Sequence, residues 1–291
     1  MLWLFTLATA VAAPPRLVQV DGGYMHTCGI DDDGRIHCWG QDDHRAVSGA
    51  PKGKGFVEVR AGLYRSCALD SKRMVVCWGR EPDGDEVTHM PDNPGPQQHV
   101  DTVDDATCAI DAKGRVRCWG TGPVAQGAPE EPDLVAMSIG GNHACVLRED
   151  GTLYCWGHGS GTDHDPPFQA VPPPWPVVQV AVGGGYHTCG LRRDGSVGCW
   201  GGDGSGDGGN VYAGHIRAPP GTFVQVTTGH DHSCGRRLDG TVTCWGELGD
   251  PEDNGGFIDL TSGFFHACGL RRNTVVCWGN DQWGQVSTTP K

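Results

Sequence analysis

The sequence predicts an all-β fold, a β-propeller built from seven sequence repeats. Three observations predict it: a repeated Cys-Trp-Gly motif, a partner cysteine at near-constant spacing before each copy, and turn residues between the two cysteines. The 291 residues include 47 glycines and 20 prolines, which are typical of turns between short elements when they recur with a period. The length suits one large all-β domain.

The Cys-Trp-Gly motif occurs seven times, at intervals of 33 to 45 residues, and a partner cysteine stands ten positions before it in six repeats and nine in the last. This arrangement uses all 14 cysteines. It predicts one disulfide within each hairpin: Cys28–Cys38, Cys67–Cys77, Cys108–Cys118, Cys145–Cys155, Cys189–Cys199, Cys234–Cys244 and Cys268–Cys277. The repeats span roughly residues 18–40, 57–79, 100–120, 135–157, 178–201, 224–246 and 258–279.

The turn between the cysteines sets the pairing of the hairpin. In the first repeat, a three-residue loop centred on Asp33 with Gly34 in the left-handed position places Cys28 opposite Cys38. Opposed residues of a non-hydrogen-bonded pair have Cα atoms about 4.5 Å apart, within disulfide range. The last repeat lacks one residue, and a two-residue loop at 272–273 restores the same pairing. The second repeat has no glycine in its turn, 71–73, so backbone strain is expected there.

Each tryptophan points to the face of the hairpin opposite the disulfide, because successive residues of a strand alternate between faces. The residue across from the tryptophan is small in every repeat, which leaves room for the indole: Thr27, Ser66, Thr107, Ala144, Thr188, Ser233 and Ala267. One tryptophan face is therefore expected to pack on the cystine face of the next unit, and a closed ring of such units is a propeller.

Several features predict a secreted, periplasmic or cell-surface protein. Residues 1–13 read as a signal peptide, with an apolar stretch and small residues at Ala12 and Ala13, and residues 14–291 as a single domain. An even, high cysteine number fits an oxidising compartment. No later segment is long and apolar enough to span a bilayer. The net charge of −13 argues against nucleic acid as a partner.

The repeat resembles that of the regulator of chromosome condensation family. The matching residues include Gly184-Gly185-Tyr186-His187-Thr188, Leu191, Asp194-Gly195 and Trp200-Gly201, and the trailing part is best kept at 278–286. The third repeat departs, with Val103 and Ala106 at the glycine and histidine positions. The resemblance covers roughly Val18 to Pro290 and implies seven blades. It also implies one of two roles: a nuclear exchange factor for a small GTPase, or an extracellular binder such as the β-lactamase inhibitory propellers. The paired cysteines resemble those of secreted bacterial variants.

Two groups of side chains could hold a metal ion. His26, His143, His187, His232 and His266 recur two residues before the first cysteine, and we expect them to cap backbone groups within their own blades rather than bind metal. Asp203, Ser205 and Asp207 resemble half of a calcium loop, but Gly214 stands where the bidentate acid should be, so a linker is favoured and no cofactor is expected. The cluster His158, Asp163, His164 and Asp165 reads as a solvated loop.

No nucleophile motif, phosphate loop or catalytic constellation is visible in the sequence, so no catalytic residue is assigned and an enzyme is not expected. The favoured function is a monomeric module that binds a protein or cell-surface ligand. The alternatives are an exchange factor for a small GTPase and a propeller hydrolase or lyase with its site at the channel mouth.

The expected ligand contacts lie in the variable segments that follow Cys-Trp-Gly. Trp175, between stiff prolines, and Tyr212 and Trp283 are the expected binding residues, because pre-ordered aromatic side chains lose little entropy on binding. For Trp175, coverage of the blade edge is an equally open interpretation.

Overall fold

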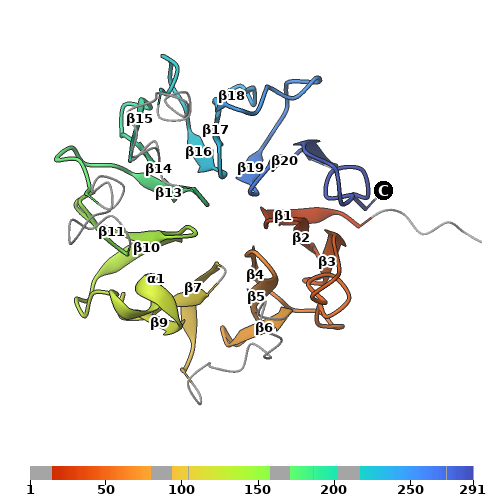
Figure 1. Cartoon of the computed structure of the whole chain (residues 1–291), viewed down its shortest axis with the longest axis horizontal. Coiled ribbons are helices and arrows are strands. Elements are labelled where there is room, and N and C mark those ends of the chain that lie inside the picture. Colours follow the sequence, from red (N-terminus) through yellow and green to blue (C-terminus); the bar gives the residue numbers. More distant parts are fainter. Residues whose placement is uncertain are drawn as a thin grey trace, which may run out of the picture.

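The computed structural model describes residues 15–79, 94–103, 105–157, 171–185, 187–201, 217–272 and 274–290. Within these residues the chain forms seven three-stranded antiparallel sheets, which surround a central opening as blades (Figure 1). The predicted all-β propeller of seven units is confirmed. In the described residues, no helix is long and apolar enough to cross a membrane.

Each blade is made of three strands that are consecutive in the chain, and the blades are numbered one to seven in chain order. The first strand of each blade lies nearest the centre (Figure 1). The inner strands are β1 (Leu17–Gly22), β4 (Glu58–Ala61), β7 (Gln97–Thr102), β10 (Leu134–Ile139), β13 (Gln179–Val182), β16 (Gln225–Thr228) and β19 (Asp259–Ser262).

The middle strands carry the first cysteine of each pair: β2 (His26–Asp31), β5 (Arg65–Leu69), β8 (Ala106–Asp111), β11 (His143–Arg148), β14 (His187–Leu191), β17 (His232–Arg236) and β20 (His266–Leu270). The outer strands carry Cys-Trp-Gly: β3 (Ile36–Gly40), β6 (Val75–Gly79), β9 (Val116–Gly120), β12 (Leu153–Gly157), β15 (Val197–Gly201), β18 (Val242–Gly246) and β21 (Val275–Gly279). A short helix, α1 (Gly122–Gln126), follows blade three.

The hairpin register agrees with the sequence prediction. In blade one Cys28 pairs with Cys38 and Thr27 with Trp39. In blade seven the shortened turn still places Cys268 opposite Cys277. All 14 cysteines are described and form the seven predicted intra-blade disulfides, with Cα–Cα distances of 4.0 to 4.1 Å.

The turn of blade two carries the strain expected from its lack of glycine. Arg73 adopts a φ of 64°, in the left-handed region that glycine occupies in the equivalent turn of blade one, where Gly34 has a φ of 76°. The hydrogen bonds of the turn compensate, because the Asp70 carboxylate accepts from the amides of Lys72 and Met74.

The glycine of each Cys-Trp-Gly is required by the backbone. Its φ lies between 95° and 121° in all seven blades. A Cβ atom on Gly40 would lie 2.5 Å from the carbonyl oxygen of Met25, and Cβ atoms on Gly79, Gly120, Gly157 and Gly279 would lie similarly close to a backbone carbonyl oxygen. The chain therefore leaves each outer strand through a conformation that only glycine adopts without strain.

The two faces of each blade pack as predicted. Between blades two and three, Trp119 lies against the face formed by Cys67, Leu69 and Val75. The same contact, tryptophan and inner-strand aliphatics of one blade on the cystine face of the preceding blade, recurs at all seven junctions. The core is therefore a ring of seven small clusters, each shared by two blades.

Ring closure uses the same contacts as every other junction. Leu17, Val20 and Trp39 of blade one pack on Cys268 and Leu270 of blade seven, and the two blades are neighbours in Figure 1. No strand is exchanged between the ends of the described chain, because each sheet holds three strands that are consecutive in sequence.

In the part of the chain that the structure describes, the segments after the outer strands of blades one, three, six and seven each cover the tryptophan of the next blade. The Trp78 indole donates to the carbonyl of Ala46 at 2.8 Å, and the Trp156 indole donates to that of Val124, in α1, at 2.7 Å. At the closure, Trp39 donates to Gln285 at 3.0 Å. These four segments thus have a structural function in addition to any contact they make with a ligand.

Candidate functional site: the axial channel and its two mouths

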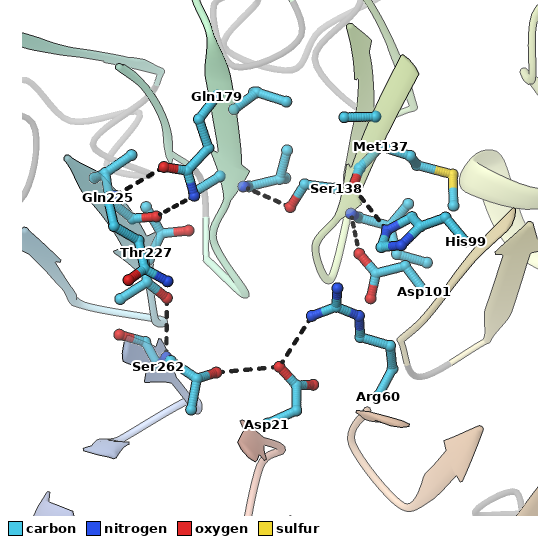
Figure 2. Close-up of a pocket in the computed structure, with 18 of the residues that line it drawn as sticks. Asp21, Arg60, His99, Asp101, Met137, Ser138, Gln179, Gln225, Thr227 and Ser262 are labelled. Atoms are coloured by element: carbon cyan, nitrogen blue, oxygen red, sulfur yellow. Dashed lines mark hydrogen bonds and ion pairs between the residues drawn. The ribbon is translucent and has the colours of Figure 1, made fainter. Parts of the chain in front are cut away.

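An axial channel runs between the seven inner strands. Its wide part is a cavity of about 580 Å³, and a narrower part of about 70 Å³ adjoins it. All seven inner strands contribute residues to the lining of both parts. Most of the side chains labelled in Figure 2 are polar and come from different blades. They occupy alternate positions of each inner strand, such as Gln19 and Asp21 in β1, because the residues between them are buried between blades.

These polar side chains connect neighbouring blades. Ser138 accepts a hydrogen bond from the Val182 amide at 3.0 Å, and Thr227 accepts one from the Ser262 amide at 2.9 Å (Figure 2). Every junction between blades has such a contact: Asp21 with Ala61, Glu58 with His99, Asp101 with Ile139, Ser138 with Val182, Gln179 with Val226, Thr227 with Ser262, and Thr261 with Gly22. The channel wall is therefore a closed ring of hydrogen bonds that holds the inner strands in place.

One side of the channel carries a cluster of charged groups. The Arg60 guanidinium lies 3.4 Å from Asp21 and 3.1 Å from Glu58, and His99 lies 2.6 Å from Glu58 (Figure 2 shows the contact of Arg60 with Asp21). Burial raises the pKa of Asp21 to about 6 even though Arg60 opposes the shift, and burial likewise raises the pKa of Asp101. Burial alone would raise the pKa of Glu58, but His99 and Arg60 outweigh it and lower that pKa.

The carboxylates outnumber the cations in this channel. Asp21, Asp101 and Asp259 line the wide part of the cavity, together with Arg60 and His99. Arg60 is itself shared between Asp21 and Glu58. The channel is therefore negative, like the chain as a whole.

The wide end of the channel is surrounded by aliphatic side chains. Six equivalent residues, each just before a channel-lining position, are 42% to 60% exposed; we call them the aliphatic mouth: Val18, Val57, Val135, Val178, Val224 and Ile258. Blade three has the exposed Gln98 at this position. Val135 and Val178 line the wide cavity directly. Exposed large aliphatic residues at one position of six blades form a patch that packing within the monomer does not explain.

The narrow end is surrounded by aromatic side chains, which we call the aromatic mouth: Tyr24, Tyr64, His230, Phe264 and Phe265. They are partly exposed and come from the short loops that join inner and middle strands of blades one, two, six and seven. Their rings contact one another: the centroids of Tyr24 and Phe264 are 4.8 Å apart, and those of His230 and Phe264 are 4.9 Å apart.

Phe264 closes part of the narrow end. A Cβ atom added to Gly184 of blade five would lie 2.3 Å from Phe264, so this ring reaches across from blade seven to the backbone of blade five. At the other side, His44 stacks against Tyr64 with centroids 4.3 Å apart, beside a small crevice. The aromatic mouth is thus a continuous surface over four blades.

Our sequence reasoning did not identify the aromatic mouth. Its residues lie at the two variable positions between the glycine and the histidine of the repeat, whereas the sequence predicts ligand contacts in the segments after Cys-Trp-Gly. The signal was present, because these positions read Tyr-Met, Leu-Tyr, His-Asp and Phe-Phe in blades one, two, six and seven. Positions that vary inside a repeated motif are not needed for packing between blades, and here they face solvent at the end of the channel.

The expected binding residues lie apart from the two mouths where they are described. Trp175 is partly buried, with its ring 5.6 Å from that of Trp200 and Arg192 stacked on it at 3.8 Å. Trp283 is partly buried in the C-terminal segment, and its amide donates to the Gln285 side chain at 3.0 Å. Binding at either residue stays a prediction. Tyr212, the calcium candidates Asp203, Ser205 and Asp207, and the cluster 158–165 lie outside the described residues.

The repeated histidines make a contact that the sequence analysis did not predict. In four of the five, the Nε2 atom bonds a hydroxyl of the next blade, where capping of backbone groups in the same blade was expected. His26 bonds Ser66 at 2.7 Å, and the equivalent pairs are His143 with Thr188, His187 with Ser233 and His266 with Thr27. In the part of the chain that is described, no three side chains converge as metal ligands.

The hydroxyl partners are the small residues that face the tryptophans. The third repeat lacks the histidine and has Ala106, and the fourth blade correspondingly has Ala144 in place of the hydroxyl. In blade two, Arg65 replaces histidine and donates to the Val103 carbonyl of the next blade at 2.9 Å. Burial lowers the pKa of His26 to about 4, and of His143 and His266 to about 3. These imidazoles are therefore neutral structural groups at neutral pH.

The fold and the channel define a disulfide-linked seven-bladed propeller, and sequence comparison agrees. Residues 17–45, 134–161, 177–207 and 223–248 match the family described as Regulator of chromosome condensation (RCC1) repeat. These segments correspond to blades one, four, five and six. Among curated proteins, none is matched by this chain.

Solved structures with the same fold include two receptor-kinase ectodomains and a yeast protein. The CRINKLY WD40 ectodomain of the Arabidopsis thaliana receptor kinase ACR4 has a TM-score of 0.74 at 23% identity, over 94% of this chain and 98% of that one. The ectodomain of the Physcomitrella patens receptor kinase CR4 has a TM-score of 0.70 at 24% identity, over 91% and 74%. Prp20p of Saccharomyces cerevisiae, described with its binding to Gsp1p and histones, has a TM-score of 0.64 at 19% identity, over 85% and 80%. At these identities the likeness shows the fold.

Proposed function

We propose that this chain is an extracytoplasmic protein-binding propeller without catalytic activity, and that its protein partner binds at the aromatic mouth. The observation that carries the proposal is the set of partly exposed, mutually packed rings of Tyr24, Tyr64, His230, Phe264 and Phe265. Aromatic side chains of this kind dominate the binding energy of protein interfaces.

The support of these rings favours recognition of a partner by a preformed surface. Each ring stands on a short loop whose following strand begins with a buried residue and is linked by a disulfide two residues later. Such side chains lose little conformational entropy when a partner is bound, which favours affinity. The partner is expected to present apolar groups to the aromatic rings and hydrogen-bonding groups to the hydroxyl of Tyr24 or Tyr64.

The cysteines support the proposed extracytoplasmic location. All 14 are paired, and structural disulfides at this density are typical of oxidising compartments. Two of the similar structures are receptor ectodomains, which agrees with an extracytoplasmic binding module. An exchange factor acting on a cytosolic GTPase would have its thiols reduced, so the disulfides disfavour that alternative.

The channel chemistry favours binding over catalysis. The Asp21 carboxylate has the raised pKa of a candidate acid, but its oxygens accept hydrogen bonds from the Ala61 amide and the Thr261 hydroxyl and lie against Arg60. A general acid or base needs an open position toward a substrate. The contacts of this carboxylate instead hold neighbouring blades together.

The experiment places a photo-crosslinking amino acid, p-benzoylphenylalanine, at Tyr24 or Phe265 in the secreted protein. The matched control carries it at Leu238, which is 87% exposed on a hairpin turn outside both mouths. Irradiation in the native extracellular fraction is expected to give one protein adduct from positions 24 and 265 and none from 238. Equal yields at all three positions would contradict the proposal. Two further variants carry the probe at Trp175 and at Trp283, and adducts confined to these two would move the site to the variable segments.

A further inference from the structure

We propose that the aliphatic mouth and the channel beneath it form a second docking site, which accepts a protruding loop of a partner protein with an arginine or lysine at its tip and apolar side chains on either side. This site lies at the opposite end of the channel from the aromatic mouth and does not depend on the function proposed above.

The aliphatic mouth supplies the apolar part of the site. Its six residues are exposed at an equivalent position in six blades, although the alternate residues of the same strands, such as Val20 and Val59, are buried. β-branched aliphatic side chains at 42% to 60% exposure around one opening are a cost in water unless something covers them. The ring shape suits a convex partner better than a flat one.

The cavity supplies the depth. Its wide part, about 580 Å³, opens among the aliphatic residues Val135 and Val178, whereas the narrow part is about 70 Å³ and is partly covered by Phe264. The channel is thus a funnel that admits a single extended side chain from the wide end. Lysine and arginine are long, and their apolar stems can contact the mouth while the charged head lies deeper.

The charge of the channel wall favours a cationic side chain at the tip of the partner's loop. Asp21, Asp101 and Asp259 line the cavity against Arg60, whose charge is shared with Glu58. A cationic head group in this partly buried space gains more from these carboxylates than it would at the surface. An anionic tip would meet the same carboxylates and be repelled.

The side chains at the level of Gln19 leave one gap in the wall. The equivalent residues of the other blades are Glu58, His99, Ala136, Gln179, Gln225 and Asp259. Ala136 of blade four is the small one, and it also lines the cavity. We therefore expect the entering side chain to pass beside Ala136 of blade four, close to Asp101 of blade three.

The test uses a disulfide-closed hairpin peptide with arginine at its tip and valine on both sides, and measures its affinity by calorimetry at pH 7.5. The matched peptides carry citrulline at the tip, which keeps the shape without the charge, or serine on both sides. We expect each replacement to weaken binding about tenfold, the effect of one lost charged or apolar contact of this size. Free arginine is expected to bind at least about tenfold more weakly than the hairpin.

Protein variants locate the site. Val135→Thr with Val178→Thr removes apolar surface at the mouth without changing shape, and Leu238→Thr is its control elsewhere on the surface. Asp259→Asn removes a channel charge, and Glu252→Gln removes an exposed one. If Asp259→Asn does not fold, Ala136→Lys places a competing cation in the gap, where other blades carry long side chains. We expect the mouth and channel variants to weaken the arginine hairpin about tenfold and the controls by less than about twofold.

The outcomes separate the interpretations. Equal affinity for the arginine and citrulline hairpins, or no binding at about 1 mM peptide, would overturn the proposal. Free arginine binding as tightly as the hairpin would show a small-molecule site and remove the role of the aliphatic mouth. Loss of binding in the control variants alone would place the peptide on another surface.

Discussion

His266 in blade seven forms a hydrogen bond of 2.8 Å with Thr27 in blade one, 239 residues away in the chain. The same imidazole–hydroxyl contact joins blades one and two, four and five, and five and six. The ring is therefore closed, between blades seven and one, by the same contact that joins other neighbouring blades. Neither end adds a strand to the other's sheet.

Removing the hydroxyl at the closure tests this contact. Thr27→Val keeps the side-chain shape but leaves the buried His266 imidazole without its partner, which we expect to destabilise the fold by about 1–3 kcal/mol. Urea unfolding at pH 7 measures the change. Thr188→Val, which removes the partner of His143, is expected to have a similar effect, and the exposed Thr222→Val almost none. A smaller effect for Thr27 than for Thr222 would mean that the contact contributes nothing to closure.

The buried histidines predict loss of stability in acid. Their folded pKa values, about 4 for His26 and about 3 for His143 and His266, lie below the ordinary value of 6.5. The unfolded chain therefore binds more protons than the folded one between these values, and stability falls as pH decreases below 6.5. Asp21 acts in the opposite direction. Its pKa is raised from 3.8 to about 6, so the folded chain binds the extra proton between these values, and the stability that this proton gives is lost as pH rises from 3.8 to 6.

A single substitution isolates one histidine. His26→Gln keeps a hydrogen-bonding group near Ser66 but does not titrate. Between pH 7 and pH 5 the wild type is expected to lose about 2 kcal/mol more stability than this variant, from one proton taken up only by the unfolded state. Urea unfolding of both proteins at the two pH values gives the difference. Parallel losses would show that His26 is protonated in the folded protein.

The hairpin and its two faces were predictable from the sequence because they depend on residues about ten positions apart. Cys28 and Cys38 are opposed through a turn that can be read directly, and Trp39 then points to the other face. The contact of His26 with Ser66 was not predictable, because it spans 40 residues and depends on how blades are spaced around the ring. The channel depends on all seven inner strands together, so the joint position of Asp21 and Asp101 could not be seen in any one repeat.

Tryptophan burial differs between repeat positions and variable segments, and stability measurements can separate them. Trp156 is 3% exposed and its indole donates to Val124, so Trp156→Ala is expected to cost about 3–5 kcal/mol through loss of contacts and a cavity. Trp175 is partly buried, and Trp175→Ala should cost clearly less. Thermal unfolding of the two variants provides the comparison. If both unfold like the wild type while a ligand is lost, the tryptophans form a binding surface and the packing account is wrong.

The disulfide of one blade is expected to contribute locally. Replacing Cys145 and Cys155 with alanine removes a link with a sequence separation of 10 and should cost about 2 kcal/mol, because a short loop constrains the unfolded chain only modestly. The hairpin register should survive, since Ala144 and Trp156 still pair. Calorimetry measures the cost, and peptide mapping of the wild type under non-reducing conditions should find only intra-blade links. A link between two blades would contradict the assignment.

The position of Phe264 offers the sharpest test of the aromatic mouth. Gly184→Ala places a methyl group 2.3 Å from the present position of the Phe264 ring, so the ring must move away from blade five. No positive φ is needed at Gly184, so the backbone can accept alanine, and the change in melting temperature should be small.

Binding of the partner at the aromatic mouth should nevertheless weaken, because the packed surface formed by Tyr24, His230 and Phe264 is rearranged. Gly255→Ala is the control, since a Cβ atom there has no neighbour within 4 Å. The readout is the yield of the adduct formed by the photo-crosslinking residue at position 24. A crystal structure of Gly184→Ala verifies that the Phe264 ring has moved. An unchanged adduct yield in that variant would show that the partner does not contact this surface.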